Sequence, residues 1–117
     1  MNKEYEVLAG LNDQQKEAAM HIDGPALVTA TAGAGKTRVV VTRAQHMIKD
    51  MGIDPSLILL TTFTNKAANE MKERIISVVG ERGKKITVGT YHSICNRILR
   101  QYCTYIGYVR TFSILDA

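Results

Sequence analysis

The chain has 117 residues, of which 45% are hydrophobic and 22% are charged, and its formal net charge is +4. This composition is that of one small globular domain and argues against a disordered chain. The sequence has no apolar run of the ~20 residues that a membrane helix needs, and residues 1–6 lack the apolar stretch of a secretory signal.

The first half of the chain predicts a helix, a strand, a loop and a second helix. Residues 11–13 supply an N-cap candidate for a helix that runs to about residue 21. Residues 26–30 are a short apolar run, which is typical of a strand buried on both faces. A glycine-rich loop follows at residues 33–35, and residues 37–51 return to helical spacing.

The second half repeats this alternation. Residues 57–62 predict a second buried strand, residues 65–79 a helix with one apolar stripe, and residues 86–90 a third strand. A last helix follows, and its apolar face carries Ile94, Cys95, Ile98, Leu99 and Tyr102. Residues 112–115 are a candidate for the start of a fourth strand.

Strands that alternate with helices predict an α/β fold in which a parallel sheet is covered on both faces. Ligands bind such sheets beyond the carboxyl ends of the strands. Three polar segments follow the predicted strands, at residues 30–37, 63–66 and 90–93. We therefore expect these segments to line one edge of one surface.

The first of these segments matches the strand–loop–helix phosphate motif, with alanine at the motif's first position. Its residues are Ala30, Thr31, Ala32, Gly33, Ala34, Gly35, Lys36 and Thr37. Small residues and glycines let successive backbone N–H groups turn toward phosphate oxygens, and the next helix directs its positive dipole end at them. In this motif the lysine reaches the β- and γ-phosphates and the threonine hydroxyl ligates Mg²⁺.

Basic residues are concentrated toward the C-terminal end. Six bases and one acid follow residue 81, whereas five acids and two bases precede residue 24. A basic half suits a phosphate-backbone partner, but a solvated turn around Gly83 accounts equally well for Arg82, Lys84 and Lys85.

The cysteines and two of the histidines carry no recognisable site. Cys95 and Cys103 lack the C-x-x-C spacing of zinc or redox sites, so a reduced cytosolic compartment is expected. We expect Cys95 in the core, with Cys103 beside the same apolar stripe, and both His21 and His46 at the surface.

Four segments, in this order and spacing, resemble successive motifs of UvrD/Rep-type superfamily 1 DNA helicases. They are LNDQQ at 11–15, TAGAGKTR at 31–38, TFTNKAANEM at 62–71 and VGTYHS at 88–93. The third is very specific to this family, and the resemblance covers nearly the whole chain. It implies a three-layer, RecA-like P-loop NTPase core with a mainly parallel sheet, of which residues 1–117 are an N-terminal, truncated part.

The resemblance also implies an activity and its requirements. These are ATP-driven translocation on single-stranded DNA and unwinding at duplex junctions with 3′–5′ polarity, with ATP and Mg²⁺ as cofactors, in the cytoplasm. The rest of the helicase is expected to pack on this part.

Individual roles follow from the same resemblance. Gln15 matches the glutamine that hydrogen-bonds adenine, and Arg38 the arginine near the base, where a planar guanidinium suits stacking. Two segments match contacts to single-stranded DNA, through an aromatic stacking face and donors to phosphate oxygens. Their residues are Phe63, Thr64, Asn65, Lys66, Thr90, His92 and Ser93.

Taken one at a time, these residues have simpler explanations. Phe63 alone is typical of a core aromatic, and Gln15 alone of a solvated helix residue. Asn65 alone is a helix N-cap, and His92 a partly buried residue near a helix start.

ATP hydrolysis by such a motor needs one carboxylate on Mg²⁺ and a second that orients water. Asp116 ends an apolar run but no glutamate follows it, so it is not the first member of that pair. The chain is therefore expected to be a fragment that does not hydrolyse ATP by itself.

Two other classes share some of these features. A GTPase or a small nucleotide kinase would share the phosphate loop, but Ala68 replaces the aspartate of a guanine-reading Asn-Lys-x-Asp, and no arginine-bearing lid is evident. A non-catalytic nucleic-acid-binding module would explain the basic half but not Lys36 and Thr37.

Overall fold

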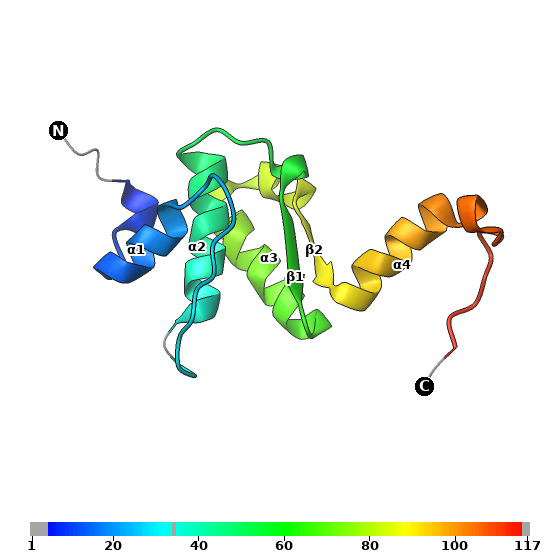
Figure 1. Cartoon of the computed structure of the whole chain (residues 1–117). Coiled ribbons are helices and arrows are strands. Elements are labelled where there is room, and N and C mark those ends of the chain that lie inside the picture. Colours follow the sequence, from blue (N-terminus) through cyan, green and yellow to red (C-terminus); the bar gives the residue numbers. More distant parts are fainter. Residues whose placement is uncertain (1–4, 34, 116–117) are drawn as a thin grey trace.

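The structure, a computed structural model, describes residues 5–33 and 35–115. Its helices and strands follow in the order α1 (Asp13–Met20), α2 (Lys36–Lys49), β1 (Leu59–Thr62), α3 (Asn65–Val79), β2 (Thr87–Thr90) and α4 (Tyr91–Tyr102). Helix α1 packs on α2, α2 packs on α3, and β1 and β2 lie against α3 (Figure 1). The α/β class and the four helices expected from the sequence are confirmed.

Side-chain caps fix the residues at which three helices begin. The Asn12 side chain accepts a hydrogen bond from the Gln15 N–H (2.9 Å), and the Gln15 side chain accepts one from the Asn12 N–H (3.0 Å). The hydroxyls of Thr64 and Thr90 each accept from the N–H three residues further on, both at 3.1 Å. Each such cap contributes about 1 kcal/mol. The N-cap of α3 is thus Thr64, and Asn65 is its first helical residue.

The main hydrophobic core lies between the sheet and helices α2 and α3. Strands β1 and β2 are parallel, with Leu59 opposite Thr87 and Thr62 opposite Thr90. The buried side chains are Val41, Ala44, Ile48, Ile58, Met71, Ile75, Val79 and Ile86. Full burial of a large aliphatic side chain contributes about 1.5–3 kcal/mol. This cluster therefore holds the two strands and the two helices together as one unit.

Helix α1 is attached to α2 by a smaller set of contacts. Leu8, Leu11 and Ala19 form a second buried cluster. The Arg43 guanidinium of α2 donates two hydrogen bonds, of 2.8 and 3.1 Å, to the carbonyl of His21, the C-cap of α1. These contacts hold α1 beside the first half of α2.

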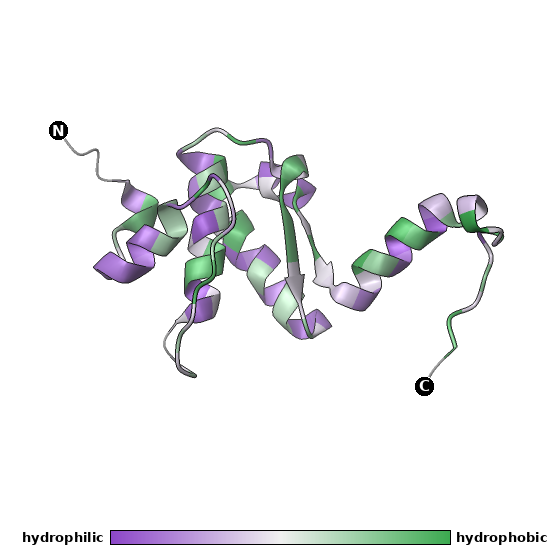
Figure 2. Ribbon diagram, in the orientation of Figure 1, coloured by the Kyte–Doolittle hydropathy of each residue, from purple (hydrophilic) through white to green (hydrophobic). Residues whose placement is uncertain are grey.

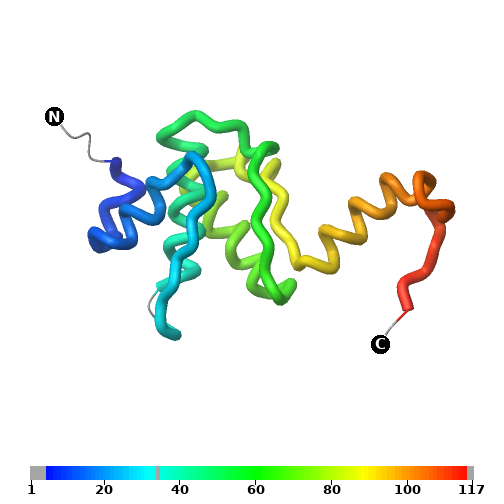
Figure 3. The backbone as a smooth tube through the Cα atoms, in the orientation of Figure 1, coloured from blue at the N-terminus to red at the C-terminus, as the bar shows by residue number. Residues whose placement is uncertain are grey.

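Residues 26–30 do not form the buried strand that their sequence predicts. The segment is extended and passes over α2 in Figure 3, and Leu27 and Val28 are 91% and 49% exposed. Within residues 5–33 and 35–115, the only strands are β1 and β2, which pair with each other. An apolar segment without a neighbouring ladder has neither backbone partners nor a sheet interior to enter.

The sheet is also shorter and more open than expected. Residues 55–57 form a 3₁₀ turn in which the Asp54 carboxylate accepts a hydrogen bond from the Ser56 N–H (2.9 Å). The second strand predicted at 57–62 therefore begins only at Leu59, which is 55% exposed. Because side chains alternate along a strand, Leu59 lies on the face away from the core, and that face is largely uncovered. The stretch 112–115 is not a strand.

The expected surface position of His46 is wrong, whereas His21 is exposed as predicted. His46 is 2% exposed, and its Nδ1 lies 2.7 Å from an Asp50 carboxylate oxygen one turn further along α2. The Tyr5 ring packs edge-on against the imidazole with 4.9 Å between ring centroids. The carboxylate at i+4 gives the imidazole a polar partner, which is what allows it to be buried.

Helix α4 extends away from the other helices and contacts mainly β1, β2 and the turn that follows it. On its predicted apolar face only Ile94 is buried, and Figure 2 shows that apolar residues continue along the exposed part of the helix. Cys95 is exposed, so its expected place in the core is wrong, whereas Cys103 is buried. In the part of the chain that the structure describes, no helix is both long and apolar enough to cross a membrane.

Candidate nucleotide and nucleic-acid site

Two glycines with positive φ shape the loop before α2. The φ angle is 81° at Gly33 and 82° at Gly35, the N-cap of α2. A residue with a Cβ is strained in this region, so glycine is needed at both positions. Ala34, which completes the predicted phosphate motif, lies outside the described residues. The first turn of α2 has no acidic residue, so no carboxylate neutralises the positive end of the helix dipole.

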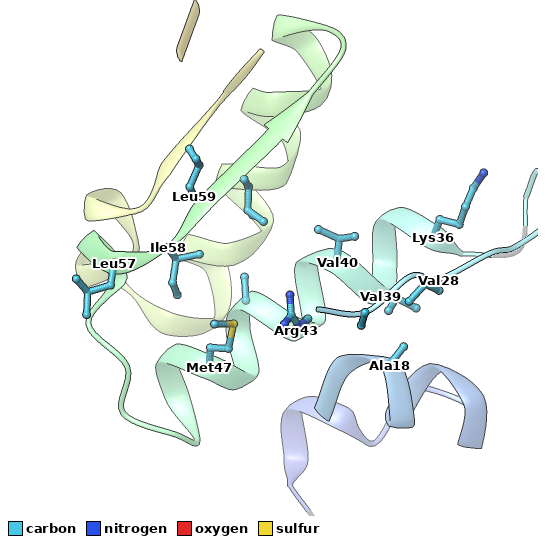
Figure 4. Close-up of a pocket in the computed structure, with 13 residues that line it drawn as sticks. Ala18, Val28, Lys36, Val39, Val40, Arg43, Met47, Leu57, Ile58 and Leu59 are labelled. Atoms are coloured by element: carbon cyan, nitrogen blue, oxygen red, sulfur yellow. The ribbon is translucent and has the colours of Figure 1, made fainter. Parts of the chain in front are cut away.

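Lys36 and Thr37 are the first two residues of α2, and both are exposed. The ion pairs among the described residues are His46–Asp50 and Lys84–Glu81, so Lys36 has no acidic partner within them. Its side chain extends from the start of the helix in Figure 4. A free ammonium beside a helix N-terminus is an arrangement that binds anions.

Gln15 of α1 lies next to this loop, although 19 residues separate it from Gly35 in the sequence. A Cβ added to Gly35 would sit 3.1 Å from the Gln15 Nε2. Gln15 and Lys36, with Thr29, Ala30 and Thr31, contribute to a cavity of about 270 Å³ between α1, the extended segment and α2. The structure therefore brings two of the predicted nucleotide-binding segments together.

The other predicted nucleotide-binding residues lie around this cavity in different ways. Thr31 and Ala32 are exposed in the loop. The Arg38 guanidinium lies against Gly10, where an added Cβ would collide with it. The Arg38 side chain thus reaches from α2 to the turn before α1 and does not line the cavity beside Gln15.

A second, larger cavity of about 470 Å³ separates the extended segment from β1 (Figure 4). Helix α2 forms its floor through Val39, Val40 and Met47, Val28 lies on one side, and residues 57–60 lie on the other. Its lining is mostly apolar, and the Lys36 side chain stands at one end. An apolar cavity beside two extended segments is the environment that a buried strand occupies in an α/β sheet.

The predicted DNA-contacting residues lie at the carboxyl ends of the two strands, with Thr90 as the last residue of β2 and the others directly after the strands. Because Thr62 is paired with Thr90, the segments that begin at Phe63 and Tyr91 leave the sheet next to each other. Phe63 is 93% exposed and is therefore not a core residue. The polar side chains of the same two segments are also exposed, namely Thr64, Asn65, Lys66, His92 and Ser93.

Hydrogen bonds within these two turns hold their shape. The Thr62 hydroxyl donates to the Thr64 carbonyl (2.9 Å), and the Ser93 hydroxyl donates to the Thr90 carbonyl (3.0 Å). A Cβ on Gly89 would stand 2.8 Å from the Ser93 Oγ, so a larger residue there would displace this hydroxyl. The loop before α2 lies at the same end of the molecule in Figure 1 as the carboxyl ends of β1 and β2.

Tyr91 was not among the predicted site residues. It is 54% exposed, and its ring centroid lies 6.1 Å from that of Phe63. The signal that could have identified it is its position, because Tyr91 and Phe63 are each the first residue after a strand.

The four helices, the parallel pair of strands and the glycine-shaped loop at the start of α2 define an α/β protein. Residues 11–117 match the UvrD/REP helicase N-terminal domain, and the chain belongs to this family. It is 49% identical over 111 residues to the ATP-dependent DNA helicase PcrA of Bacillus subtilis, a match to 95% of this chain and 15% of that protein.

Two further relatives have similar sequence identity and coverage. A probable DNA helicase II homolog of Mycoplasma capricolum is 46% identical over 107 residues, which are 92% of this chain and 15% of the relative. The ATP-dependent DNA helicase PcrA of Staphylococcus aureus is 44% identical over 110 residues, which are 94% of this chain and 15% of that protein. The chain thus spans about 15% of the length of these relatives.

Proposed function

We propose that this chain binds ATP and supplies the phosphate-binding part of the motor domain of an ATP-dependent DNA helicase. The observation that carries the proposal is the start of α2, where Gly33 and Gly35 have positive φ and Lys36 has no acidic partner among the described residues. Membership of the UvrD/REP family and the names of the relatives supply the DNA-helicase part.

In this proposal the loop from Ala30 to Thr37 surrounds the phosphates. Backbone N–H groups hold phosphate oxygens, the Lys36 ammonium neutralises their charge, and Gln15 reads the adenine edge. Thr37 would ligate Mg²⁺, which supplies charge neutralisation at the β- and γ-phosphates when it is bound. The described residues contain no group of three or more His, Cys, Asp or Glu that could hold a metal, so further ligands would come from the nucleotide and from elsewhere.

We assign single-stranded DNA to the carboxyl ends of β1 and β2. The exposed Phe63 offers a stacking face, and the exposed Lys66 and His92 offer donors to phosphate oxygens. Translocation along the strand, unwinding of duplex junctions, 3′–5′ polarity and a cytoplasmic location belong to this proposal through the family resemblance alone.

The proposed fold of the intact domain is a RecA-like three-layer core, of which residues 1–117 form the N-terminal part. Residues 26–30 would be one of its buried strands, since their sequence is apolar and the cavity beside them is lined by apolar side chains. Other strands of the same protein would fill that cavity and bring the carboxylates that ATP hydrolysis needs.

The decisive experiment compares Lys36→Ala with Lys49→Ala, a matched removal of an exposed lysine at the other end of α2. In the 117-residue chain we expect weak ATP binding, weaker GTP binding and no turnover. Loss of a charge-assisted hydrogen bond of about 1.5–3 kcal/mol should lower the affinity of Lys36→Ala for ATP by ten-fold or more, as measured by calorimetric titration.

Lys49→Ala should bind ATP like the wild type. Equal ATP affinity for all three proteins would exclude the loop as the nucleotide site. A clear preference for GTP would favour a GTPase instead. Turnover by the isolated chain that Lys36→Ala abolishes would contradict the need for carboxylates from elsewhere.

A further inference from the structure

The rings of Phe63 and Tyr91 form a pair at the carboxyl ends of the two strands. Their centroids are 6.1 Å apart and their planes are inclined by 53°. The pairing of Thr62 with Thr90 places them together, because each ring belongs to the next residue along its chain. Phe63 is 93% and Tyr91 54% exposed, so the pair presents aromatic surface to solvent.

The charge around this pair favours an anionic partner. Helices α3 and α4 both begin here, and neither has an acidic residue in its first turn. The positive ends of two helix dipoles therefore lie beside the rings without a neutralising carboxylate, and the exposed Lys66 adds a positive charge.

A second exposed aromatic pair, Tyr102 and Tyr105, lies in a different electrostatic environment. Tyr102 and Tyr105 have a similar separation of 6.2 Å and an inclination of 44°, and they are 52% and 84% exposed. They lie at the opposite end of α4, where the helix dipole is negative and repels phosphates. Of these two pairs, only the one at the strand ends lies beside the positive ends of helix dipoles.

We propose that Tyr91 is a second base-stacking residue, and that Phe63 and Tyr91 together form a stacking platform for consecutive bases of a single strand. This inference rests on the proposed binding of single-stranded DNA at the same edge. A base held between two rings needs parallel planes about 6.8 Å apart, twice the step of about 3.4 Å along a stacked strand. The inclined rings at 6.1 Å do not make such a slot, so bases lie on the pair and not between its members.

The test uses the full-length protein with Tyr91→Ala, Tyr91→Phe and Tyr91→Leu, and with Phe63→Ala as a benchmark. Tyr102→Ala is the matched control, since it removes a comparably exposed ring from the other pair. Each protein is titrated into a fluorescent oligothymidylate of about 16 nucleotides and into an abasic strand of equal length. Thermal unfolding of each variant is recorded alongside.

Tyr91→Ala and Tyr91→Leu should bind the thymidylate strand about ten-fold more weakly, because each removes one stacking face. Tyr91→Phe should stay within about two-fold of the wild type, since the ring remains. The leucine variant keeps the apolar bulk, so it separates lost stacking from lost packing. On the abasic strand all Tyr91 variants should match the wild type, and Tyr102→Ala should match it on both strands.

Several results would overturn this role for Tyr91. They are normal thymidylate binding by Tyr91→Ala and Tyr91→Leu, equal losses on the abasic strand, or a loss in Tyr91→Phe as large as in Tyr91→Ala. If Phe63→Ala shows its loss while the Tyr91 variants do not, the proposed function stands and only the platform fails. If the wild type binds neither strand, both fail together.

Discussion

The unit formed by α2, α3, β1 and β2 and the segment at residues 26–30 use similar apolar residues in opposite ways. In the unit, Ile58 and Ile86, the residues directly before β1 and β2, are 7% and 2% exposed and pack in one cluster with Ile75 of α3, which is fully buried. In the segment, Leu27 is 91% exposed. The difference lies in their partners, because β1 has β2 beside it and the segment has no strand beside it among the described residues.

This contrast shows that apolar composition specifies a buried strand only where a ladder partner is present. β1, α3 and β2 are consecutive in the chain, so the helix that connects the strands also covers them. The segment before the phosphate loop has the same composition, but neither β1 nor β2 pairs with it. Three sets of substitutions test this contrast.

The largest loss of stability is expected for Ile75→Ala in the 117-residue chain, with Leu27→Ala as the comparison. Ile75 is 0% exposed, and its truncation should lower the free energy of unfolding by about 2–5 kcal/mol because a cavity remains. Leu27→Ala should change it by less than about 0.5 kcal/mol. Denaturant unfolding followed by circular dichroism measures both.

The same pair in the full-length protein tests the proposed RecA-like core. If residues 26–30 are a buried strand there, Leu27→Ala should become costly and approach the effect of Ile75→Ala. A Leu27→Ala variant that stays neutral in both proteins would contradict that proposal.

An intermediate loss of stability is expected for His46→Ala, with His21→Ala as the comparison. His46 is buried and bonded to Asp50, so its loss leaves a gap and a carboxylate without its partner, at a cost of about 1–3 kcal/mol. The His21 side chain is exposed, and only its carbonyl holds Arg43, so His21→Ala should be nearly neutral. Equal melting temperatures for the two variants would show that the buried contact contributes nothing.

The smallest change in stability is expected for a substitution of Asp54, the residue that caps the turn before β1. Hydrogen bonds from the Ser56 backbone and side chain hold the pKa of the Asp54 carboxyl below its ordinary value of 3.8, with a further contribution from the charge of Lys85. A lowered folded-state pKa gives stability that is present above pH 3.8 and is lost as pH falls through the lower value. Asp54→Asn should therefore melt slightly earlier than the wild type at pH 7, and the difference should vanish in acid. A difference that does not depend on pH would contradict this account.

The sequence predicted the helices well because their signals are local. The cap at Asn12 and the apolar stripe of α3 lie within a few residues of the elements they define. The predicted strands at 57–62 and 86–90 are present, although shorter. The strand at 26–30 could not be assigned correctly from its own residues, since pairing depends on segments distant in the chain.

The geometry of the candidate site likewise depends on both local and distant parts of the chain. The glycines of the phosphate loop follow from a local backbone requirement, and the motif contains them. The approach of Gln15 to Gly35 depends on how α1 packs on α2, so the residues alone did not predict it. Tyr91 was missed because its significance comes from the register of β1 and β2, which brings Phe63 next to it.

The chain order of β1, α3 and β2 also has a kinetic consequence. All contacts among β1, α3 and β2 join residues between 59 and 90, so forming them closes only short loops and costs little chain entropy. Contacts between nearby residues form fastest in small domains. During refolding, the two strands and their connecting helix should therefore assemble first, while residues 26–30 are still unpaired.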